Sequence, residues 1–184
     1  MPIEVPFLPA DENLNPLSQD WGEAYKELCA LIRAKVPAIK HVDLYYGQEQ
    51  FLLDKEGWMP FRAPAVFLEF RAAEVQDLGD QVQQLTMDIG VYLLHETVQD
   101  TDDRSLGQRR AMEFVGLLRQ LHAALHGAQG THFMPLGRTE LSRAEAPPFC
   151  YFYRQTYRCV IIDNGAAPQW NWQEPPLEPV VESE

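Results

Sequence analysis

The stretch F-C-Y-F-Y-R-Q-T-Y-R-C-V-I-I-D, residues 149–163, decides the fold of this chain. It is rich in β-branched and aromatic residues, which favours a strand over a helix, and its first half is apolar on both faces. Such a strand is covered on both sides, so we predict a long interior strand here. The segment A-E-A-P-P, residues 144–148, joins it to a predicted strand at residues 131–143, which makes the pair a β-hairpin.

Two clear strands precede this hairpin in the chain. Residues 64–70, P-A-V-F-L-E-F, are mostly apolar and alternate, which predicts a largely buried strand. Residues 85–94 form a second long strand, because apolar side chains recur there with a period of two. One face of that strand carries Leu85, Met87, Ile89, Val91 and Leu93. The other face carries Thr86, Asp88 and Gly90.

Three other segments give weaker strand signals. Residues 42–46 and 50–53 are short β-like pieces separated by a turn at Gly47. Residues 71–84 contain Gly79, several glutamines and mixed charge. We predict a loop over residues 71–84, one that can extend the neighbouring strands.

Two amphipathic helices are predicted. Ser18 or Asp20 provides the N-cap of the first, which ends before Pro37. Its apolar side chains at helical spacing are Trp21, Tyr25, Leu28 and Ile32. The second helix spans about residues 108–126, with Gly127 placed for its C-cap. Its apolar stripe consists of Phe114, Leu117, Leu118, Leu121 and Leu125.

These elements predict a single α+β domain over residues 18–163, with a mixed or antiparallel β-sheet and two amphipathic helices packed on it. Residues 1–17 contain four prolines and are predicted to form an extended N-terminal arm. Residues 164–184 contain four prolines, four acidic residues, Trp170 and Trp172, and are predicted to form a C-terminal arm. Such an arm becomes ordered only when it docks on a surface. That surface belongs either to another subunit of an assembly or to the arm's own domain.

Composition excludes several classes of function. The net charge is −12 and no run of basic residues exists, which disfavours a nucleic-acid-binding surface and an anionic membrane surface as partners. No apolar run approaches the roughly 20 residues that span a bilayer, and the N-terminus lacks the pattern of a secretory signal. Three widely spaced cysteines, Cys29, Cys150 and Cys159, indicate reduced structural thiols in the cytosol. Cys150 and Cys159 differ in parity along their strand and should point to opposite faces.

Candidate chemical groups are few. His122 and His126 have the i, i+4 spacing of two metal ligands, but the glutamate of H-E-x-x-H is missing. Histidine is also favoured at a helix end by the helix dipole. His95 and Glu96 precede an acidic loop that lacks the ligand order of a calcium loop. We therefore predict no catalytic, metal or cofactor site and no enzymatic activity.

Five segments resemble one known family. They are A-Y-K-E-L-C-A-L-I-R-A-K-V-P-A-I-K-H-V-D-L-Y-Y-G (24–47), P-A-V-F-L-E-F (64–70), V-Q-Q-L-T-M-D-I-G-V-Y-L-L-H-E-T (82–97), L-H-A-A-L-H-G (121–127) and Q-T-Y-R-C-V-I-I-D (155–163). In this order they resemble the tail-completion or tail-terminator proteins of long-tailed bacteriophages and of phage-tail-like particles. The similarity covers roughly residues 22–163 and leaves both arms outside it.

The resemblance implies a structural virion protein that is not an enzyme and needs no cofactor. Such proteins assemble into a homo-oligomeric ring, typically a hexamer, that terminates the tail tube and meets the head connector or neck protein. The implied location is the head–tail junction of the virion, after assembly in the host cytoplasm. DNA passes through the ring without specific binding, and a protomer of net charge −12 suits this because like charges repel the phosphates.

This hypothesis predicts roles for two groups of residues, one at contacts between subunits and one facing the lumen or the tube. The arms make inter-subunit contacts through Phe7, Trp170 and Trp172. The acidic loop 95–107, or the glutamine-rich loop 75–84, is expected to face the lumen or the tube. The candidate residues are Gln81, Gln83, Asp100, Asp102 and Asp103.

Two alternatives stay open at this point. One is a head–tail connector or neck adaptor of the same particle, since both kinds of protein are small ring-forming adaptors. The other is a cytosolic small-molecule-binding or enzymatic α+β domain with a pocket beneath the aromatic strand. Tyr151, Tyr153 and Tyr157 share one face of that strand and are the candidates to line such a pocket.

Overall fold

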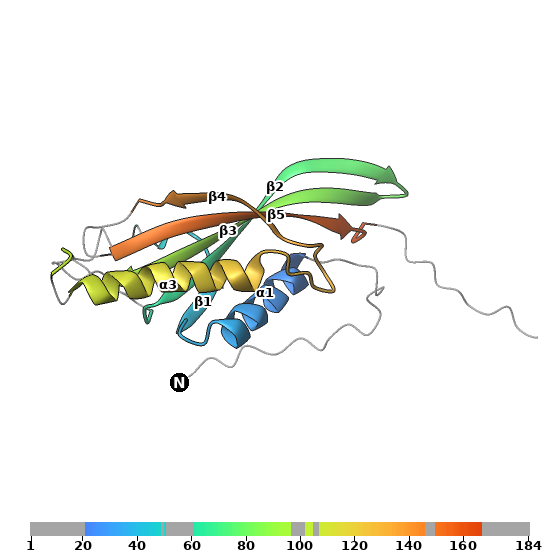
Figure 1. Cartoon of the computed structure of the whole chain (residues 1–184). Helices are drawn as coiled ribbons and strands as arrows, with labels where there is room; N and C mark the ends of the chain where they lie inside the picture. The colour runs from blue at the N-terminus through green and yellow to red at the C-terminus, as the bar shows by residue number, and fades with distance from the viewer. Residues whose placement is uncertain are drawn as a thin grey trace, which may run out of the picture.

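A five-stranded mixed sheet with two helices on one face forms the fold (Figure 1). The computed structural model describes residues 21–48, 50, 61–96, 102–104, 107–145 and 150–166. The elements are α1 (Trp21–Lys35), β1 (His41–Leu44), β2 (Ala65–Gly79), β3 (Val82–Glu96), α3 (Gly107–Leu125), β4 (Gly137–Arg143) and β5 (Cys150–Asp163). The strand order is β1-β2-β3-β5-β4, with β1 parallel to β2 and the other pairs antiparallel. The predicted α+β class is therefore confirmed.

The strand predicted from residues 149–163 is the interior strand β5. It lies between β3 and β4 and pairs with β3 over its whole length, from Cys150 opposite Glu96 to Asp163 opposite Gln83. Its side chains are buried on both faces, with Tyr157 on one and Phe152 on the other. The hairpin of β4 and β5 is confirmed, because the two strands are antiparallel neighbours.

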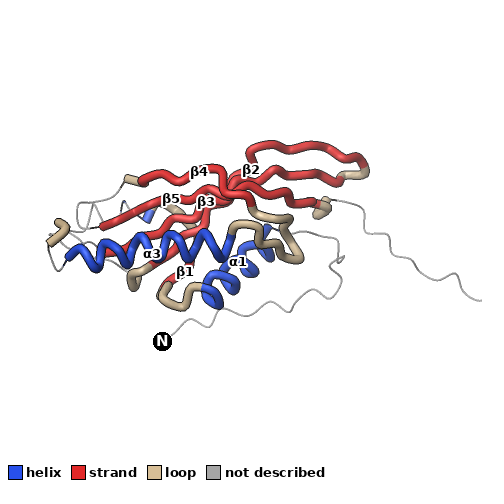
Figure 2. The backbone as a smooth tube through the Cα atoms, viewed as in Figure 1, coloured by secondary structure: helices blue, strands red, loops and turns tan. Residues whose placement is uncertain are grey.

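Both helices pack on the same face of the sheet (Figure 2). The apolar stripe of α3 is buried there as predicted, with Leu121 and Leu125 fully enclosed. Phe114 stacks on Tyr151 at 5.0 Å between ring centroids and contacts Tyr153 at 5.3 Å. The tyrosine-bearing face of β5 is thus covered by α3 and is part of the core.

The opposite face of the sheet, which we call the second face, has a smaller apolar cluster at one end. Its buried members are Ala65, Phe67, Tyr92, Leu94, Cys150 and Phe152. Cys159 belongs to the larger cluster on the helix side. The prediction that Cys150 and Cys159 point to opposite faces is therefore confirmed.

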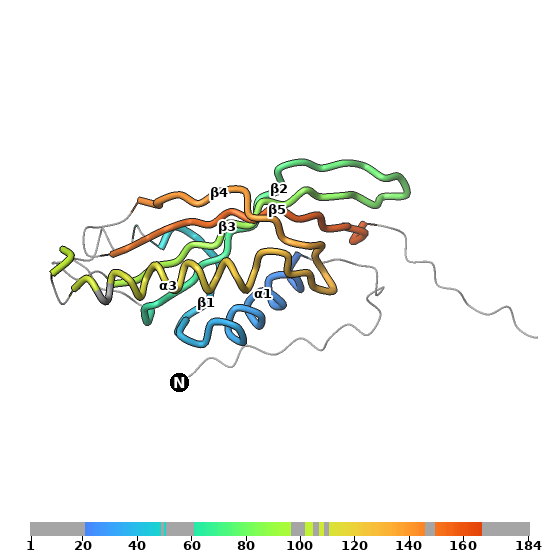
Figure 3. The backbone as a smooth tube through the Cα atoms, in the orientation of Figure 1, coloured from blue at the N-terminus to red at the C-terminus, as the bar shows by residue number. Residues whose placement is uncertain are grey.

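Beyond the helices, β2 and β3 continue as a long hairpin, residues 71–86, which we call the β2–β3 arm (Figure 3). Its turn residues Asp80 and Gln81 have φ of 53° and 62°, which is the geometry of a tight hairpin turn. The prediction of a loop was wrong for residues 71–79 and 82–84, which are strand, whereas its allowance that the segment extends the neighbouring strands is confirmed. Residues 71–79 of β2 are exposed on both faces, so neither face selects apolar side chains and the alternation that identifies a strand is missing there.

Other boundaries also differ from prediction. The strand predicted at residues 131–143 begins only at Gly137, because the preceding residues bond to the end of α3. There the Leu136 carbonyl accepts from the Gly127 amide at 2.7 Å, and the Leu136 amide donates to Ala128 at 2.9 Å. Gln50, predicted to begin a strand, is helical, and residues 51–53 lie outside the described part of the chain.

The helix boundaries agree with prediction within two residues. α1 ends at Lys35, before Pro37, and α3 ends at Leu125. Gly127 has φ of +78°, as a C-cap glycine requires. The predicted N-cap candidates Ser18 and Asp20 lie outside the described residues.

Candidate functional site

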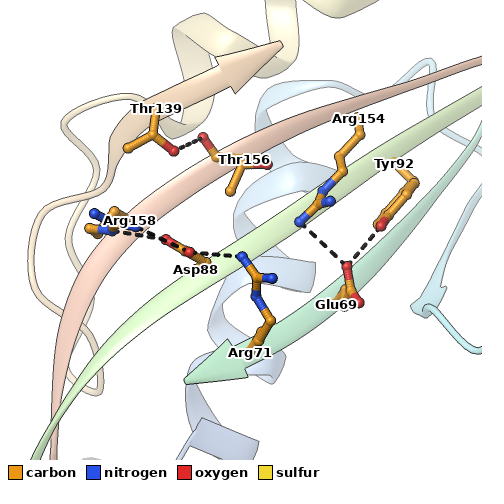
Figure 4. Close-up of polar contacts among 8 residues, drawn as sticks. All are labelled: Glu69, Arg71, Asp88, Tyr92, Thr139, Arg154, Thr156 and Arg158. Carbon is orange, nitrogen blue, oxygen red and sulfur yellow. Dashed lines mark hydrogen bonds and ion pairs between the residues drawn. The ribbon is translucent and has the colours of Figure 1, made fainter. Parts of the chain in front are cut away.

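Polar side chains gather on the second face in the middle of β2, β3 and β5 (Figure 4). The strand period of two and the register place them together, since residues directly opposite each other across a sheet share a face. We call them the polar cluster: Glu69, Arg71, Asp88, Tyr92, Arg154, Thr156 and Arg158. It separates the apolar cluster at one end of the second face from the β2–β3 arm at the other.

Asp88 is the centre of one half of the polar cluster. It is 4% exposed and accepts hydrogen bonds from Arg158 Nε at 2.9 Å, Arg158 Nη2 at 3.2 Å and Arg71 Nη2 at 3.1 Å. The hydrogen bonds from Arg158, joined by those from Arg71, hold the pKa of Asp88 below its usual range despite burial. Both arginines are more than half exposed, so their remaining donors face solvent.

Glu69 is the centre of the other half. It accepts a hydrogen bond from the Tyr92 hydroxyl at 2.7 Å and lies 3.7 Å from Arg154 Nη2. The guanidinium carbon of Arg154 lies 5.5 Å from the centre of the Tyr92 ring, a cation–π arrangement. Tyr92 also stacks on Tyr45, with ring centroids 4.2 Å apart and planes within 7°.

Gly90 allows these side chains to approach the sheet. A Cβ at this position would lie 3.0 Å from Tyr92 Cε2, 3.1 Å from Glu69 Oε2 and 3.2 Å from Arg154 Nε. These distances are shorter than ordinary van der Waals contacts, so a side chain at residue 90 would push the three groups outward. The glycine therefore fixes the packing of this half of the polar cluster.

A groove of about 240 Å³ lies beside Arg154 at the end of the second face where β5 begins. Its walls come from β4, from β5 and from the stacked tyrosines. The lining residues are Tyr45, Tyr92, Ser142, Arg143, Ala144, Glu145, Phe152 and Arg154. The groove therefore places the Arg154 guanidinium, which is paired with Glu69, beside the stacked aromatic pair and the carboxylate residue Glu145.

Two buried polar atoms of the polar cluster lack a hydrogen-bond partner among the described residues. They are the hydroxyl oxygen of Thr156, a residue only 3% exposed, and Nε of Arg154. The Thr156 carbonyl is satisfied, because the Thr139 hydroxyl donates to it at 3.2 Å. An unpartnered buried group costs free energy, so these atoms are candidates for contact with a further molecule or segment.

His122 and His126 have structural neighbours at the end of α3. Their rings lie 4.9 Å apart, and His126 Nδ1 accepts from the Arg138 amide at 3.1 Å. His122 lies 3.5 Å from the Tyr157 hydroxyl, and burial followed by the Arg138 charge lowers its pKa. Across the described ranges no group of three or more His, Cys, Asp or Glu side chains is arranged to hold a metal ion.

The three cysteines are free and buried. Burial raises the pKa of Cys150 and of Cys159 to about 11, and the pKa of Cys29 is also raised, chiefly by burial. A thiol with such a pKa is almost entirely protonated near neutral pH and is a poor nucleophile. These side chains therefore act as apolar core residues.

The two loops assigned to the lumen or the tube lie at opposite ends of the molecule. Gln81 and Gln83 are exposed at the tip of the β2–β3 arm, and Asp102 and Asp103 are exposed beyond the other end of β3. Fourteen residue steps along β3 separate these ends by about 46 Å, at about 3.3 Å per residue. The structure therefore does not bring the two predicted groups together.

Four of the predicted site residues have no described position. Phe7, Asp100, Trp170 and Trp172 lie outside the described residues. The polar cluster was not predicted as a site, although part of its signal is visible in the sequence. Glu69 interrupts one apolar strand, and Asp88 and Gly90 interrupt another, where their parity places these two on the same face.

Comparison with protein families and with curated protein sequences finds no match to this chain. None of the described helices is long and apolar enough to cross a membrane.

Proposed function

We propose that this chain is a structural virion protein whose copies form a ring, most simply a hexamer, at the end of a phage tail tube. In this proposal the ring terminates the tube and joins it to the head connector. The support is the resemblance of residues 22–163 to tail-terminator proteins, together with the α+β fold that the resemblance implies.

The unpaired edges of the sheet support the proposal. At one edge β4 pairs with β5 alone among the described strands. At the other edge β1 covers only Ala65–Leu68 of β2, so the rest of β2 has a partner on one side only within the described chain. Two different free edges suit head-to-tail contacts between copies, which close into a ring when the rotation allows.

Exposed apolar side chains on the β2–β3 arm favour a contact there. Val75 is 54% exposed and Leu78 is 50% exposed, on a hairpin that extends past both helices (Figure 1). The outer strand of this arm, residues 69–79 of β2, has a strand partner on one side only among the described residues, and a neighbouring copy that pairs with it and buries these side chains would stabilise it. The arm is therefore our candidate for the contact between protomers.

The charge of the protomer fits passage of DNA through the ring. A net charge of −12 per copy repels phosphates, so a lumen lined by this protein does not retain the DNA. The acidic residues Asp102 and Asp103 are exposed and available for such a lining. Reversing the charge of Asp102 and Asp103 should slow infection if they face the lumen, and unchanged infectivity would remove them from it.

Ring formation is tested directly with the purified chain. The double variant V75K/L78K should fold normally but sediment as smaller species than the wild type in analytical ultracentrifugation. Met112→Lys is the matched control, because Met112 is also exposed (56%) but lies on α3. A wild-type protein that stays monomeric at all concentrations, also with tail tube protein present, would contradict the proposed ring.

The head–tail connector remains the alternative within the same particle. Both assignments place the protein at the head–tail junction, and they differ in whether it contacts the tail tube or the portal side. Binding of the purified chain to tail tube protein, tested against the portal-side protein, separates them. We favour the terminator because the resemblance is to that family.

A further inference from the structure

The two outer strands of the sheet have exposed edges. Among the described strands β4 pairs with β5 alone, and residues 69–79 of β2 pair with β3 alone. Residues 71–79 of β2 and residues 138–141 of β4 are exposed. Each edge therefore offers backbone N–H and C=O groups to a further strand.

These two edges cannot meet within one chain, because they are the opposite sides of one sheet. β3 and β5 lie between β2 and β4, which puts the two edges about 14 Å apart at about 4.8 Å per strand spacing. A contact between the edges therefore joins two copies. Three antiparallel pairings lead from β2 to β4, so these strands run in opposite directions. Copies that continue one sheet side by side keep these directions, and β4 of one copy then meets β2 of the next antiparallel.

One set of β2 residues directs its backbone groups toward the outer edge. The Tyr45 amide donates to the Leu68 carbonyl at 2.9 Å, so Leu68 faces outward. Outward and inward residues alternate along a strand, and the register with β3 carries the outward set to Val75 and Asp77. Val75 lies opposite Leu85, which packs on the helix-side core, so the side chains of this set lie on the helix side of the sheet.

The outer edge of β4 has the matching arrangement. The Ala144 amide donates to the Phe152 carbonyl at 2.9 Å, so Ala144 faces inward and Leu141 faces outward by the same alternation. Leu141 lies opposite Gln155, whose side-chain amide donates to the Leu118 carbonyl of α3 at 2.9 Å. The side chain of Leu141 therefore also lies on the helix side.

One antiparallel register brings complementary side chains together. With Leu141 opposite Val75, two apolar side chains that are 50% and 54% exposed meet. The register shift of β4 between Arg138 and Glu140 then puts Arg138 opposite Asp77. Aromatic, aliphatic and opposite-charge pairs directly across from each other stabilise a sheet.

The neighbouring registers lack this complementarity. Moving β4 by one outward residue toward the turn of the β2–β3 arm puts Leu141 opposite Asp77. Moving it the other way puts Glu140 opposite Glu74, because the register shift of β2 between Ala72 and Glu74 removes one residue from the pairing. Like charges directly opposite each other destabilise a sheet.

The charges of the Asp77–Arg138 pair are not balanced by the contacts that each makes in the single chain. The Asp77 carboxylate accepts from the Gly79 amide at 2.9 Å, and Arg138 Nη1 donates to the side-chain oxygen of Gln155 at 3.2 Å. Both partners are neutral groups. A contact between copies thus adds the first charged partner to each side chain.

We infer that β4 of one copy pairs antiparallel with the free length of β2 in the next copy, with Leu141 opposite Val75 and Arg138 opposite Asp77. This inference rests on the proposed ring. It adds to the ring a single β-sheet that continues from copy to copy, with the β2–β3 arm as the receiving edge. The seven residues of β4 fit the eleven residues of β2 that β1 leaves uncovered.

Disulfide trapping between full-length chains tests this register. It places Gln76 opposite Glu140 in a non-hydrogen-bonded pair, with Cα atoms about 4.5 Å apart, within the range of a disulfide. Both side chains are exposed in the single chain, whereas the three native cysteines are buried. Mixing the Q76C variant with a larger, tagged E140C variant under mild oxidation should give a linked pair of the two chains.

The matched control shifts the cysteine by two residues on the same face of β2. Glu74 is also exposed, but in the inferred register it is only diagonal to Glu140, with Cα atoms about 7–8 Å apart. This separation exceeds the usual limit of a disulfide. The pair E74C with E140C should therefore give at least about fivefold less product.

Charge reversal adds a second test that keeps the cysteine pair in place. Asp77→Arg in the Q76C chain should lower the yield of the linked pair about threefold, because two arginines then face each other. Arg138→Asp in the E140C chain should restore the yield. Circular dichroism establishes that each variant has the wild-type fold.

The outcomes separate the edge pairing from the proposed function. Linked pairs of the Q76C and E140C chains support the edge pairing, whether or not the protein is found in particles. A ring in analytical ultracentrifugation without these pairs overturns the edge pairing and leaves the ring standing. Product mainly between two Q76C chains overturns it in favour of two β2 edges that pair with each other, and more product from E74C with E140C overturns the register. A monomeric chain without linked product overturns both the edge pairing and the ring.

Discussion

Replacing Asp88 by asparagine tests the polar cluster most sharply. The substitution keeps the shape of the side chain but removes the charge that Arg71 and Arg158 hold with three hydrogen bonds. Hydrogen bonds to a charged group contribute about 1.5–3 kcal/mol each when buried. Both arginines are more than half exposed and regain water when released, so we expect a total loss of about 2 kcal/mol at pH 7.

The loss should depend on pH in a defined direction. The pKa of Asp88 is lowered in the folded protein, so its contribution is fully present above the unfolded value, about 3.9, and is lost as the pH falls through the folded value. Urea unfolding of the wild type and D88N at pH 7, 5 and 3 gives the free-energy difference at each pH. The difference should be constant between pH 7 and 5 and smaller at pH 3.

A matched control is Asp103→Asn, because Asp103 is exposed beyond the end of β3. That variant should change the free energy of unfolding by less than about 0.5 kcal/mol. A D88N variant as stable as the wild type at pH 7, or a difference that does not shrink at pH 3, would refute the stabilising role of the Asp88 carboxylate.

Three further predictions concern packing and reactivity. Gly90→Ala should lower the free energy of unfolding by about 1 kcal/mol, because its Cβ meets Tyr92 and Arg154, and urea unfolding measures this; a neutral substitution would show that these side chains move aside freely. Leu121→Ala, at a fully buried position of α3, should cost about 3 kcal/mol in the same assay, and less than about 1 kcal/mol would mean that the helix is loosely packed. Cys150 and Cys159 should react with a thiol reagent at pH 8 on the order of 100-fold more slowly in the folded than in the unfolded chain, since burial raises each pKa to about 11; equal rates would place them at the surface.

The core of the fold could be predicted because burial imposes periodicity. In β5 and in α3 one face meets a neighbouring layer, so apolar side chains recur with the period of the element. The hairpin of β4 and β5 followed from the proline-containing link between them. These features are local in sequence, and a local pattern is sufficient to identify them.

The β2–β3 arm was missed for the opposite physical reason. Residues 71–79 of β2 are exposed, so no face selects apolar side chains and the segment has the composition of a loop. Its strand pairing comes from the continuous register with β3, which a single-strand pattern does not show. The start of β4 at Gly137 was missed because backbone hydrogen bonds to the end of α3 hold the preceding residues.

Only part of the polar cluster could be predicted from the sequence. The parity of Asp88 and Gly90 was evident, but their partners Arg158 and Arg154 lie on a strand about 70 residues away. Register between β3 and β5 brings them together, and no local motif encodes that register. The sequence predicted which face Asp88 occupies, and the structure supplied its partners.

The central claim is that this protein belongs to the head–tail junction of a particle. The most direct measurement is to purify intact particles from the source and image labelled copies of the chain by electron microscopy. We expect label at the head–tail junction, at about six copies per particle if the ring is hexameric. Protein recovered only in the soluble lysate, with no label on the particles, would contradict the claim.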